Sequence, residues 1–77
     1  MNELFSKFRQ DVKTILHSNS MTYSQISEKI GIAESTIKCF MCGASDSRRT
    51  AERIADALNC ELVYNNGIYL INEKEDT

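Results

Sequence analysis

The sequence lacks any apolar run long enough to span a bilayer or to act as a secretory signal. The membrane-spanning and secreted classes are therefore not indicated, and we expect a cytoplasmic protein with no membrane partner. Thiols in that compartment are kept reduced. The chain's three cysteines are accordingly expected to be free thiols.

Sequence motifs of common enzyme classes are also lacking. There is no glycine-rich phosphate loop, no HExxH motif and no plausible nucleophile accompanied by a base. The single histidine, His17, falls near the end of a predicted helix, where the helix dipole favours a cation, and no acid–base partner is identifiable for it. We therefore expect a protein that is not an enzyme and that holds no metal and no cofactor.

A basic excess, the usual electrostatic signature of indiscriminate nucleic-acid binding, is absent, because the net charge is −2. Residues 73–76 carry three acids and one base, which accounts for this whole charge. Residues 1–72 are thus neutral and can still present a basic face. Their cations include two clusters, Lys7, Arg9 and Lys13 in one and Arg48, Arg49 and Arg53 in the other.

The length of 77 residues predicts a single domain, over residues 1–72, near the lower limit at which a hydrophobic core suffices for folding. A dimer would relieve that shortage of core. Residues 73–77 are predicted to form a disordered acidic tail.

An amphipathic helix is predicted over residues 2–17, because its apolar residues follow steps of one, three and four. The cations of this segment lie off the apolar stripe. We expect them on a solvated polar face, with phosphate contact as the alternative. The stripe consists of Leu4, Phe5, Phe8, Val12, Ile15 and Leu16.

The stretch from position 22 to 43 predicts two short helices joined by a tight turn. Thr22 and Gln25 make a capping box that begins the first helix, over residues 23–30. Gly31 then ends it, because glycine reaches the left-handed conformation without the steric cost of a Cβ atom.

The second of these helices is predicted over residues 33–42 and ends at Gly43. Its apolar residues, Ile37, Phe40 and Met41, stand at spacings of three and four. A further helix is predicted over residues 47–58, with Ala51, Ile54, Ala55 and Leu58 on one face.

A β-hairpin is predicted over residues 60–71, where the composition changes to β-branched and aromatic residues. Asn66-Gly67 is the strongest short hairpin signal and sets the register of the two strands. The expected pairs are Asn65 with Ile68, Tyr64 with Tyr69, Val63 with Leu70 and Leu62 with Ile71.

This register places apolar residues on both faces of the ribbon, since adjacent pairs point in opposite directions. A two-stranded ribbon cannot bury two faces on one small helical layer, and its edges are open. We therefore expect the ribbon to meet its twin in a second chain and to make a homodimer. The expected dimer interface is Leu62, Val63, Tyr64, Tyr69, Leu70 and Ile71.

The sequence from residue 22 to residue 58 resembles the helix-turn-helix of the phage repressor and Cro (XRE) family. The resemblance is carried by the spacing of Ile26, Gly31, Ile32, Thr36, Ile37 and Gly43, followed by a helix that ends Ala-Asp-Ala-Leu-Asn. It implies a mainly α fold, a four-helix repressor-like domain with a C-terminal β-hairpin. The implied function is sequence-specific binding of double-stranded DNA by a dimeric transcriptional repressor, on a palindromic operator and with helix 33–42 in the major groove.

The same resemblance implies which residues contact DNA. Base edges would be read by Glu34, Ser35, Lys38 and Cys39, with Thr36 near the backbone. Phosphates would be contacted by Tyr23, Ser24 and Gln25 at the start of helix 23–30. Arg48 and Arg49 would contact phosphate or serve surface solubility. For Gln25, the capping box is an equal interpretation.

This chain departs from the family at Glu34, which phosphates would repel unless it accepts from a cytosine, and at Ala33, which replaces a capping residue. Glu34 and the neutral-to-acidic charge support an alternative function: a protein-interaction module on the same fold, such as an antitoxin or a phage-encoded inhibitor of a host defence protein. On this alternative, part of helix 33–42 is apolar, through Cys39, Phe40, Met41 and Cys42.

Cys39 and Cys42 form a C-x-x-C motif, which occurs in metal sites and in redox sites. Zinc requires four ligands and only Cys60 and His17 remain, while a thioredoxin-like site requires a βαβ unit that the sequence lacks. We expect inert thiols, with metal binding and redox switching as less favoured alternatives.

Overall fold

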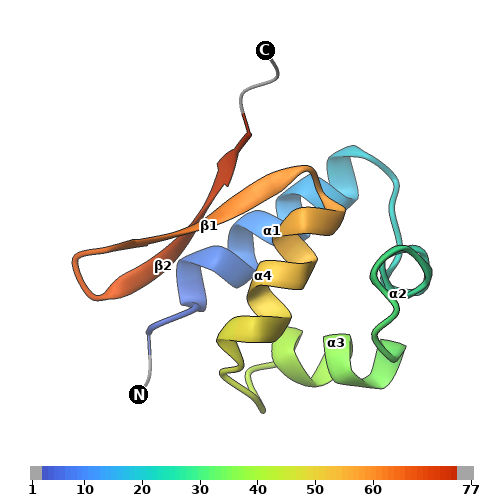
Figure 1. Ribbon diagram of the computed structural model, residues 1–77, viewed down its shortest axis with the longest axis horizontal. Helices are drawn as coiled ribbons and strands as arrows, with labels where there is room; N and C mark the ends of the chain where they lie inside the picture. The colour runs from blue at the N-terminus through green and yellow to red at the C-terminus, as the bar shows by residue number, and fades with distance from the viewer. Residues whose placement is uncertain (1–2, 75–77) are drawn as a thin grey trace.

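The computed structural model describes residues 3–74 and shows four helices followed by a two-stranded antiparallel hairpin (Figure 1). This confirms the predicted mainly helical layout. The elements are α1 (Ser6–Ser18), α2 (Tyr23–Ile30), α3 (Glu34–Met41), α4 (Arg48–Ala57), β1 (Cys60–Asn65) and β2 (Ile68–Glu73).

The helices divide the molecule into two sides. α1 and α4 both carry the hairpin, with β1 against α4 and β2 against α1 (Figure 1). α2 and α3 pack against each other and against α4 on the opposite side. The hairpin and the α2–α3 pair therefore reach solvent in different directions.

The core between these elements is built on aromatic rings. Phe5, Phe8 and Phe40 meet edge to face, with ring centroids 5.1 to 6.1 Å apart. All three are completely buried, and so are branched side chains from every helix. Edge-to-face contacts add roughly 0.5–1.5 kcal/mol per pair to the free energy of area burial. The branched residues are Val12, Ile26, Ile37 and Ile54.

The first helix begins later than the predicted residue 2. Glu3, Leu4 and Phe5 are not helical, and residue 2 lies outside the described residues. The carbonyl of Leu4 accepts a hydrogen bond from the backbone N–H of Tyr69, at 2.8 Å, so the chain enters the fold along the edge of β2. The apolar stripe extends to Leu4 because this segment is buried against the hairpin, not because it is helical.

The second helix has the predicted bounds and the predicted cap. Gln25 donates its backbone N–H to Oγ1 of Thr22 at 3.2 Å, and the Gln25 side chain accepts from the backbone N–H of Thr22 at 2.9 Å. Gly31 ends α2 with φ at 70°, the left-handed conformation expected of it.

The third and fourth helices are each one residue shorter at both ends than predicted. Ala33 precedes α3 without any side-chain cap, and Cys42 follows its last residue. α4 is capped by Ser47, whose hydroxyl oxygen accepts from the backbone N–H of Thr50 at 3.2 Å. Single-residue differences at helix ends leave the predicted faces unchanged.

The hairpin has the predicted register in all four pairs. Asn66 and Gly67 both have positive φ, at 52° and 84°, as the two-residue turn of a right-twisted ribbon requires. β2 continues to Glu73, and the backbone N–H of Lys74 donates to the carbonyl of Asn59. The prediction of a disordered tail from residue 73 was therefore wrong for its first two residues, and residues 75–77 lie outside the described part.

The hairpin packs onto its own helices through one face. Leu62, Tyr69 and Ile71 contact the core, and the ring of Tyr69 stacks on that of Phe5 with centroids 4.8 Å apart. Val63 and Leu70 point to the other face and remain half-exposed. We call the outward-facing Val63, Ile68 and Leu70 the outer apolar face.

No helix within residues 3–74 has the length and apolar character needed to cross a membrane.

Candidate nucleic-acid interface

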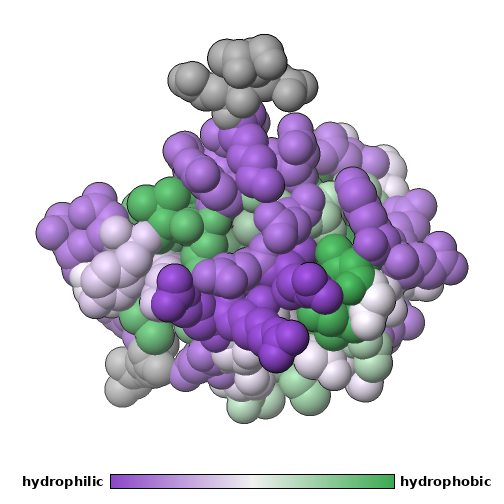
Figure 2. All heavy atoms as spheres, viewed as in Figure 1, coloured by the Kyte–Doolittle hydropathy of each residue, from purple (hydrophilic) through white to green (hydrophobic). Residues whose placement is uncertain are grey.

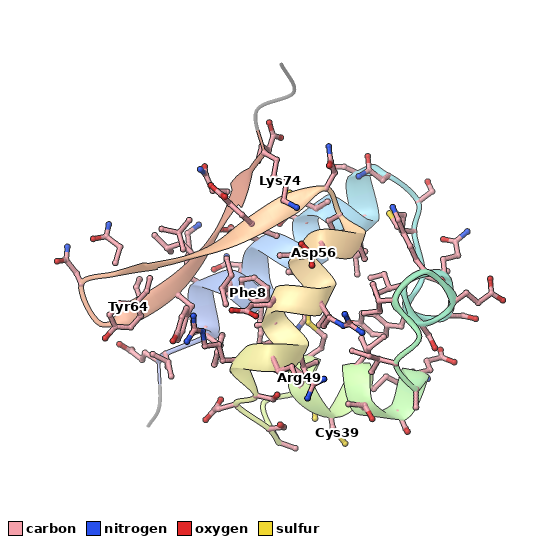
Figure 3. The ribbon with its side chains drawn as sticks, in the orientation of Figure 1. Phe8, Cys39, Arg49, Asp56, Tyr64 and Lys74 are labelled. Carbon is pink, nitrogen blue, oxygen red and sulfur yellow. The ribbon has the colours of Figure 1, made fainter. Side chains whose placement is uncertain are left out.

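The third helix has one buried side and one exposed side. Ile37, Phe40 and Met41 are buried against the other helices. The exposed residues are polar or small, and Figure 3 shows Cys39 pointing away from the core at the outer surface of α3. We call this surface the α3 polar face, and it consists of Ser35, Thr36, Lys38, Cys39 and Cys42.

The apolar surface expected on the alternative function is largely missing. Phe40 is completely buried and Met41 is 4% exposed. Both belong to the hydrophobic core, where the Phe40 ring meets the rings of Phe5 and Phe8. Of the four residues proposed for that surface, only Cys39 and Cys42 are exposed.

Glu34 and Lys38 form an ion pair on α3, with 3.5 Å between Oε1 and Nζ. Their side chains are 44% and 61% exposed, so the pair contributes little to stability and opens easily. The carboxylate nevertheless neutralises the one ammonium group of the α3 polar face. Lys38 can therefore reach a base edge only when it leaves Glu34.

At the start of α2, fewer side chains are available to donate hydrogen bonds to a phosphate than the sequence predicted. Gln25 is engaged in the capping box, and Tyr23 is half-buried against the core. Ser24 is exposed. The backbone N–H groups of the first turn of a helix suit an anion, so Ser24 and these groups are the available phosphate donors.

α4 carries three exposed arginines, of which Arg48 and Arg49 lie in its first turn. Arg48 pairs with Glu52 at 3.2 Å, whereas Arg49 and Arg53 make no ion pair within residues 3–74. Figure 3 places Arg49 at the end of α4 that lies next to α3, on the same side of the molecule as Cys39. The most hydrophilic side chains gather over α4 in Figure 2. Arg49 is thus a free cation beside the α3 polar face.

Arg9 has a role that the sequence analysis missed. We predicted a solvated side chain or a phosphate contact, but its side chain is only 12% exposed. Its guanidinium donates to the carbonyls of Phe40 and Ser45, at 2.6 and 2.7 Å, and to Oδ1 of Asp46 at 2.9 Å. It also lies over the Phe40 ring, 4.7 Å from the centroid.

The contacts of Arg9 fix the end of α3. The carbonyls at a helix C-terminus have no partners within the helix, and an arginine that donates to them both satisfies and orients them. A comparable contact joins α2 to α4, where Nζ of Lys29 donates to the carbonyl of Ala57 at 2.8 Å. Neither was predictable from spacing, since the partners are 31 and 28 residues apart.

A groove runs between α1 and α3 beside the α3 polar face. Lys13 from α1 and Lys38 from α3 both line it, together with Tyr23, Met41 and Cys42. Lys13 forms no ion pair with any acid in the described part of the chain. Lys13 is therefore an unpaired cation on the rim of this groove, whereas Lys38 is paired with Glu34.

The three cysteines are free thiols in different surroundings. Cys39 and Cys42 are exposed and Cys60 is buried. Burial raises the pKa of the Cys60 thiol, the Glu73 carboxylate raises it further, and the Lys74 ammonium opposes both. Among residues 3–74, histidine, cysteine and acidic side chains form no cluster of three or more that could hold a metal ion.

Comparison of the chain with protein-family models, with curated proteins and with solved structures found no match.

Proposed function

We propose that this protein is a sequence-specific regulator that binds double-stranded DNA with α3 in the major groove. The observation that carries the proposal is the exposed α3 polar face, which lies between the start of α2 and the free cation Arg49. A single polar helix face with phosphate donors on its flanks matches the way in which a helix-turn-helix contacts DNA.

On this proposal, the residues of α3 read base edges. Lys38 donates to guanine O6 and N7 after leaving Glu34, and Ser35 donates or accepts. Glu34 accepts from cytosine N4, which removes its repulsion from the phosphates. Thr36 lies near the backbone, and Cys39 contacts the groove one turn later.

The phosphate contacts position α3 in the groove. Ser24 and the first-turn N–H groups of α2 would contact one strand, and Arg49 would contact a phosphate on the other flank. Arg48 contributes less, because Glu52 already pairs with it. Arg9 and Lys29 contact no DNA on this proposal, but they hold α3 and α2 in place through backbone carbonyls.

We infer a homodimer through the hairpin, by a surface that keeps Val63, Tyr64 and Leu70 of the six residues predicted at first. The inner residues already pack on the helices, which leaves the outer apolar face and the exposed Tyr64. In a hairpin with a two-residue turn, alternate pairs exchange hydrogen bonds, so the backbone groups of Leu62 and Tyr64 point outward from β1. That edge can pair with β1 of a second copy, whereas the β2 edge is occupied at Tyr69 by Leu4.

A dimer of this kind would bind a palindromic operator. A two-fold axis through the paired β1 strands relates the two α3 helices, and each would read one half-site, with centres about 34 Å apart. Bound across a promoter, such a dimer represses transcription by blocking access to that promoter. That last step rests on the resemblance to the phage repressor and Cro family, and not on a contact in the structure.

The experiment that tests this proposal is selection from a randomised duplex pool at two salt concentrations, followed by sequencing of the retained DNA. We expect an inverted repeat whose affinity falls steeply with salt, with a log–log slope of about −0.9 per phosphate contact. Recovery of no motif at low salt would contradict it. The protein-interaction alternative would then be favoured, and its affinity for a partner would change little with salt.

A further inference from the structure

The two thiols of the C-x-x-C motif lie on the surface, and the proposed function gives a role in DNA contact to Cys39 but none to Cys42. Cys39 lies on the α3 polar face, and Cys42 is the residue that follows the last turn of α3. Sγ of Cys42 donates a weak hydrogen bond to the carbonyl of Cys39, at 3.3 Å. The Cys42 thiol therefore lies back over the turn that contains Cys39, while the residue remains exposed.

The surroundings of Cys42 favour an anionic reagent. Cys42 lines the groove that Lys13 and Lys38 also line, and Lys13 forms no ion pair with any acid in residues 3–74. Reactive cysteines occur in accessible, electropositive places of this kind, often next to a second thiol that resolves the product. Cys60 is instead buried, and burial raises the pKa of its thiol.

We propose that Cys39 and Cys42 form a thiol–disulfide exchange site for a small anionic disulfide, with Cys42 as the attacking thiol and Cys39 as the resolving thiol. Oxidised glutathione, which carries carboxylates, has the required chemistry. Its carboxylates would meet Lys13 in the groove, and Lys38 once that side chain leaves Glu34. This assigns to the motif a reaction that the sequence alone made a less favoured alternative.

The exchange proceeds in two balanced steps. The Cys42 thiolate attacks one sulfur of oxidised glutathione, forms a mixed disulfide and displaces a glutathione thiolate, which takes up the proton lost from Cys42. The Cys39 sulfur then attacks Sγ of Cys42, forms an internal disulfide and displaces the second glutathione, which takes up the proton lost from Cys39. The protein dithiol is oxidised by two electrons and one glutathione disulfide is reduced to two thiols.

The internal disulfide requires a local change in α3. Residues three apart on a helix have Cβ atoms about 5–6 Å apart, whereas a disulfide requires about 3.5–4.5 Å. The necessary movement is confined to the end of the helix, where Gly43 already has φ at 91° and a Cβ there would meet no atom within 4 Å. On the proposed function, this movement distorts the α3 polar face, so oxidation would weaken operator binding.

The reaction is tested on the reduced full chain with oxidised glutathione, followed by intact-mass measurement. The wild type should pass through one glutathione adduct to a species that has lost two hydrogens. Cys39→Ser should stop at the adduct, and Cys42→Ser should form no internal disulfide and react more slowly. Cys60→Ala is the control and should behave as the wild type. A stable adduct on the wild type, or equal reactivity of Cys60, would overturn the proposal.

The role of the groove is tested by charge. Rates should be measured with an anionic reagent, dithiobis-nitrobenzoate, and with a neutral one, dithiodipyridine. Lys13→Glu should slow the anionic reaction several-fold and leave the neutral one unchanged, while Lys7→Glu should affect neither. An unchanged anionic rate in Lys13→Glu would contradict the groove as the binding site.

These measurements need no DNA, so their failure is distinguishable from failure of the proposed function. Where the selected operator is in hand, the oxidised chain should bind it about tenfold more weakly than the reduced chain, and the reductant dithiothreitol should restore binding. Undiminished binding by the oxidised chain would overturn the regulatory consequence.

Discussion

The α3 helix and the hairpin differ in the side that they expose to solvent. Each element has two sides, and the chain is too small to bury both of them. α3 buries all its large apolar residues and exposes polar ones, whereas the hairpin buries one apolar face and leaves Val63, Ile68 and Leu70 half-exposed. A polar exposed helix face suits a polar partner such as DNA, and an apolar exposed sheet face suits a protein surface. The two ends of the molecule thus have different proposed partners.

The largest effect is expected from placing charge on the outer apolar face. Val63→Lys with Leu70→Lys should convert the dimer into a monomer, because it replaces apolar side chains on the pairing strands with like charges that face one another across the two copies. Operator affinity should fall about a hundredfold or more, since each half-site is then bound alone. Sedimentation equilibrium measures the first effect and a salt-controlled DNA titration the second.

Asn65→Lys with Asn72→Lys is the matched control for this double variant, because both positions are exposed and point to the same side of the ribbon. It should remain dimeric. If Val63→Lys with Leu70→Lys dimerises with unchanged affinity, the hairpin is not the dimer interface. The proposal for α3 would not be affected.

The next largest effect is expected from Arg9→Met, which keeps an unbranched apolar stem but removes the guanidinium. The carbonyls of Phe40 and Ser45 lose a charged donor in a partly buried site, so the free energy of unfolding should fall by about 2–3 kcal/mol. Urea titration measures this loss. Hydrogen exchange should show the loss of protection at the end of α3 more than in β1 and β2.

Lys7→Met is the control for Arg9→Met, because Lys7 only pairs with Asp11 on an exposed surface. It should change the free energy of unfolding by less than about 0.5 kcal/mol. Equal destabilisation by the two substitutions would show that Arg9 does not anchor α3.

A smaller effect is expected from Lys38→Ala on the α3 polar face. Loss of a base contact should weaken binding to the selected operator by about 1–3 kcal/mol and relax the preference at one base pair. Stability should hardly change, since the ion pair with Glu34 is exposed. Competition binding against single-base variants of the operator checks the result. A uniform loss across all variants would instead make Lys38 a phosphate contact.

The smallest effect is expected from Glu34→Gln, which frees Lys38 and removes one negative charge from the interface. Binding to random-sequence DNA should strengthen by a few tenths to about 1 kcal/mol. Discrimination at the base pair that Glu34 reads should decrease at the same time. A duplex titration at fixed salt measures both, and weaker binding to random DNA would contradict a repulsive role for this carboxylate.

Local signals in the sequence predicted much of this fold. The capping box of Thr22 and Gln25 and the turn at Asn66-Gly67 involve residues within a few positions of one another, so spacing alone fixes them. The start of α1 was missed because the carbonyl of Leu4 pairs with Tyr69, which is far away in the chain. Distant partners of this kind leave no periodic pattern.

The candidate site was also predicted in part. The polar positions of α3 followed from the resemblance, and the structure exposes Ser35, Lys38 and Cys39. The anchoring of α3 by Arg9 was not predicted, since an arginine beside an apolar stripe usually faces solvent. The division of the hairpin into an inner and an outer face also required the structure, because both faces are apolar in sequence.

The most direct test of the central claim is a map of backbone amide shift changes as a short random-sequence duplex is added at low salt. The changes are predicted to concentrate on α3 from Glu34 to Cys39, on the start of α2 and on the start of α4, and to leave β1 and β2 unaffected. Changes confined to the hairpin, or none at all, would contradict the assignment of α3 as the DNA-binding element.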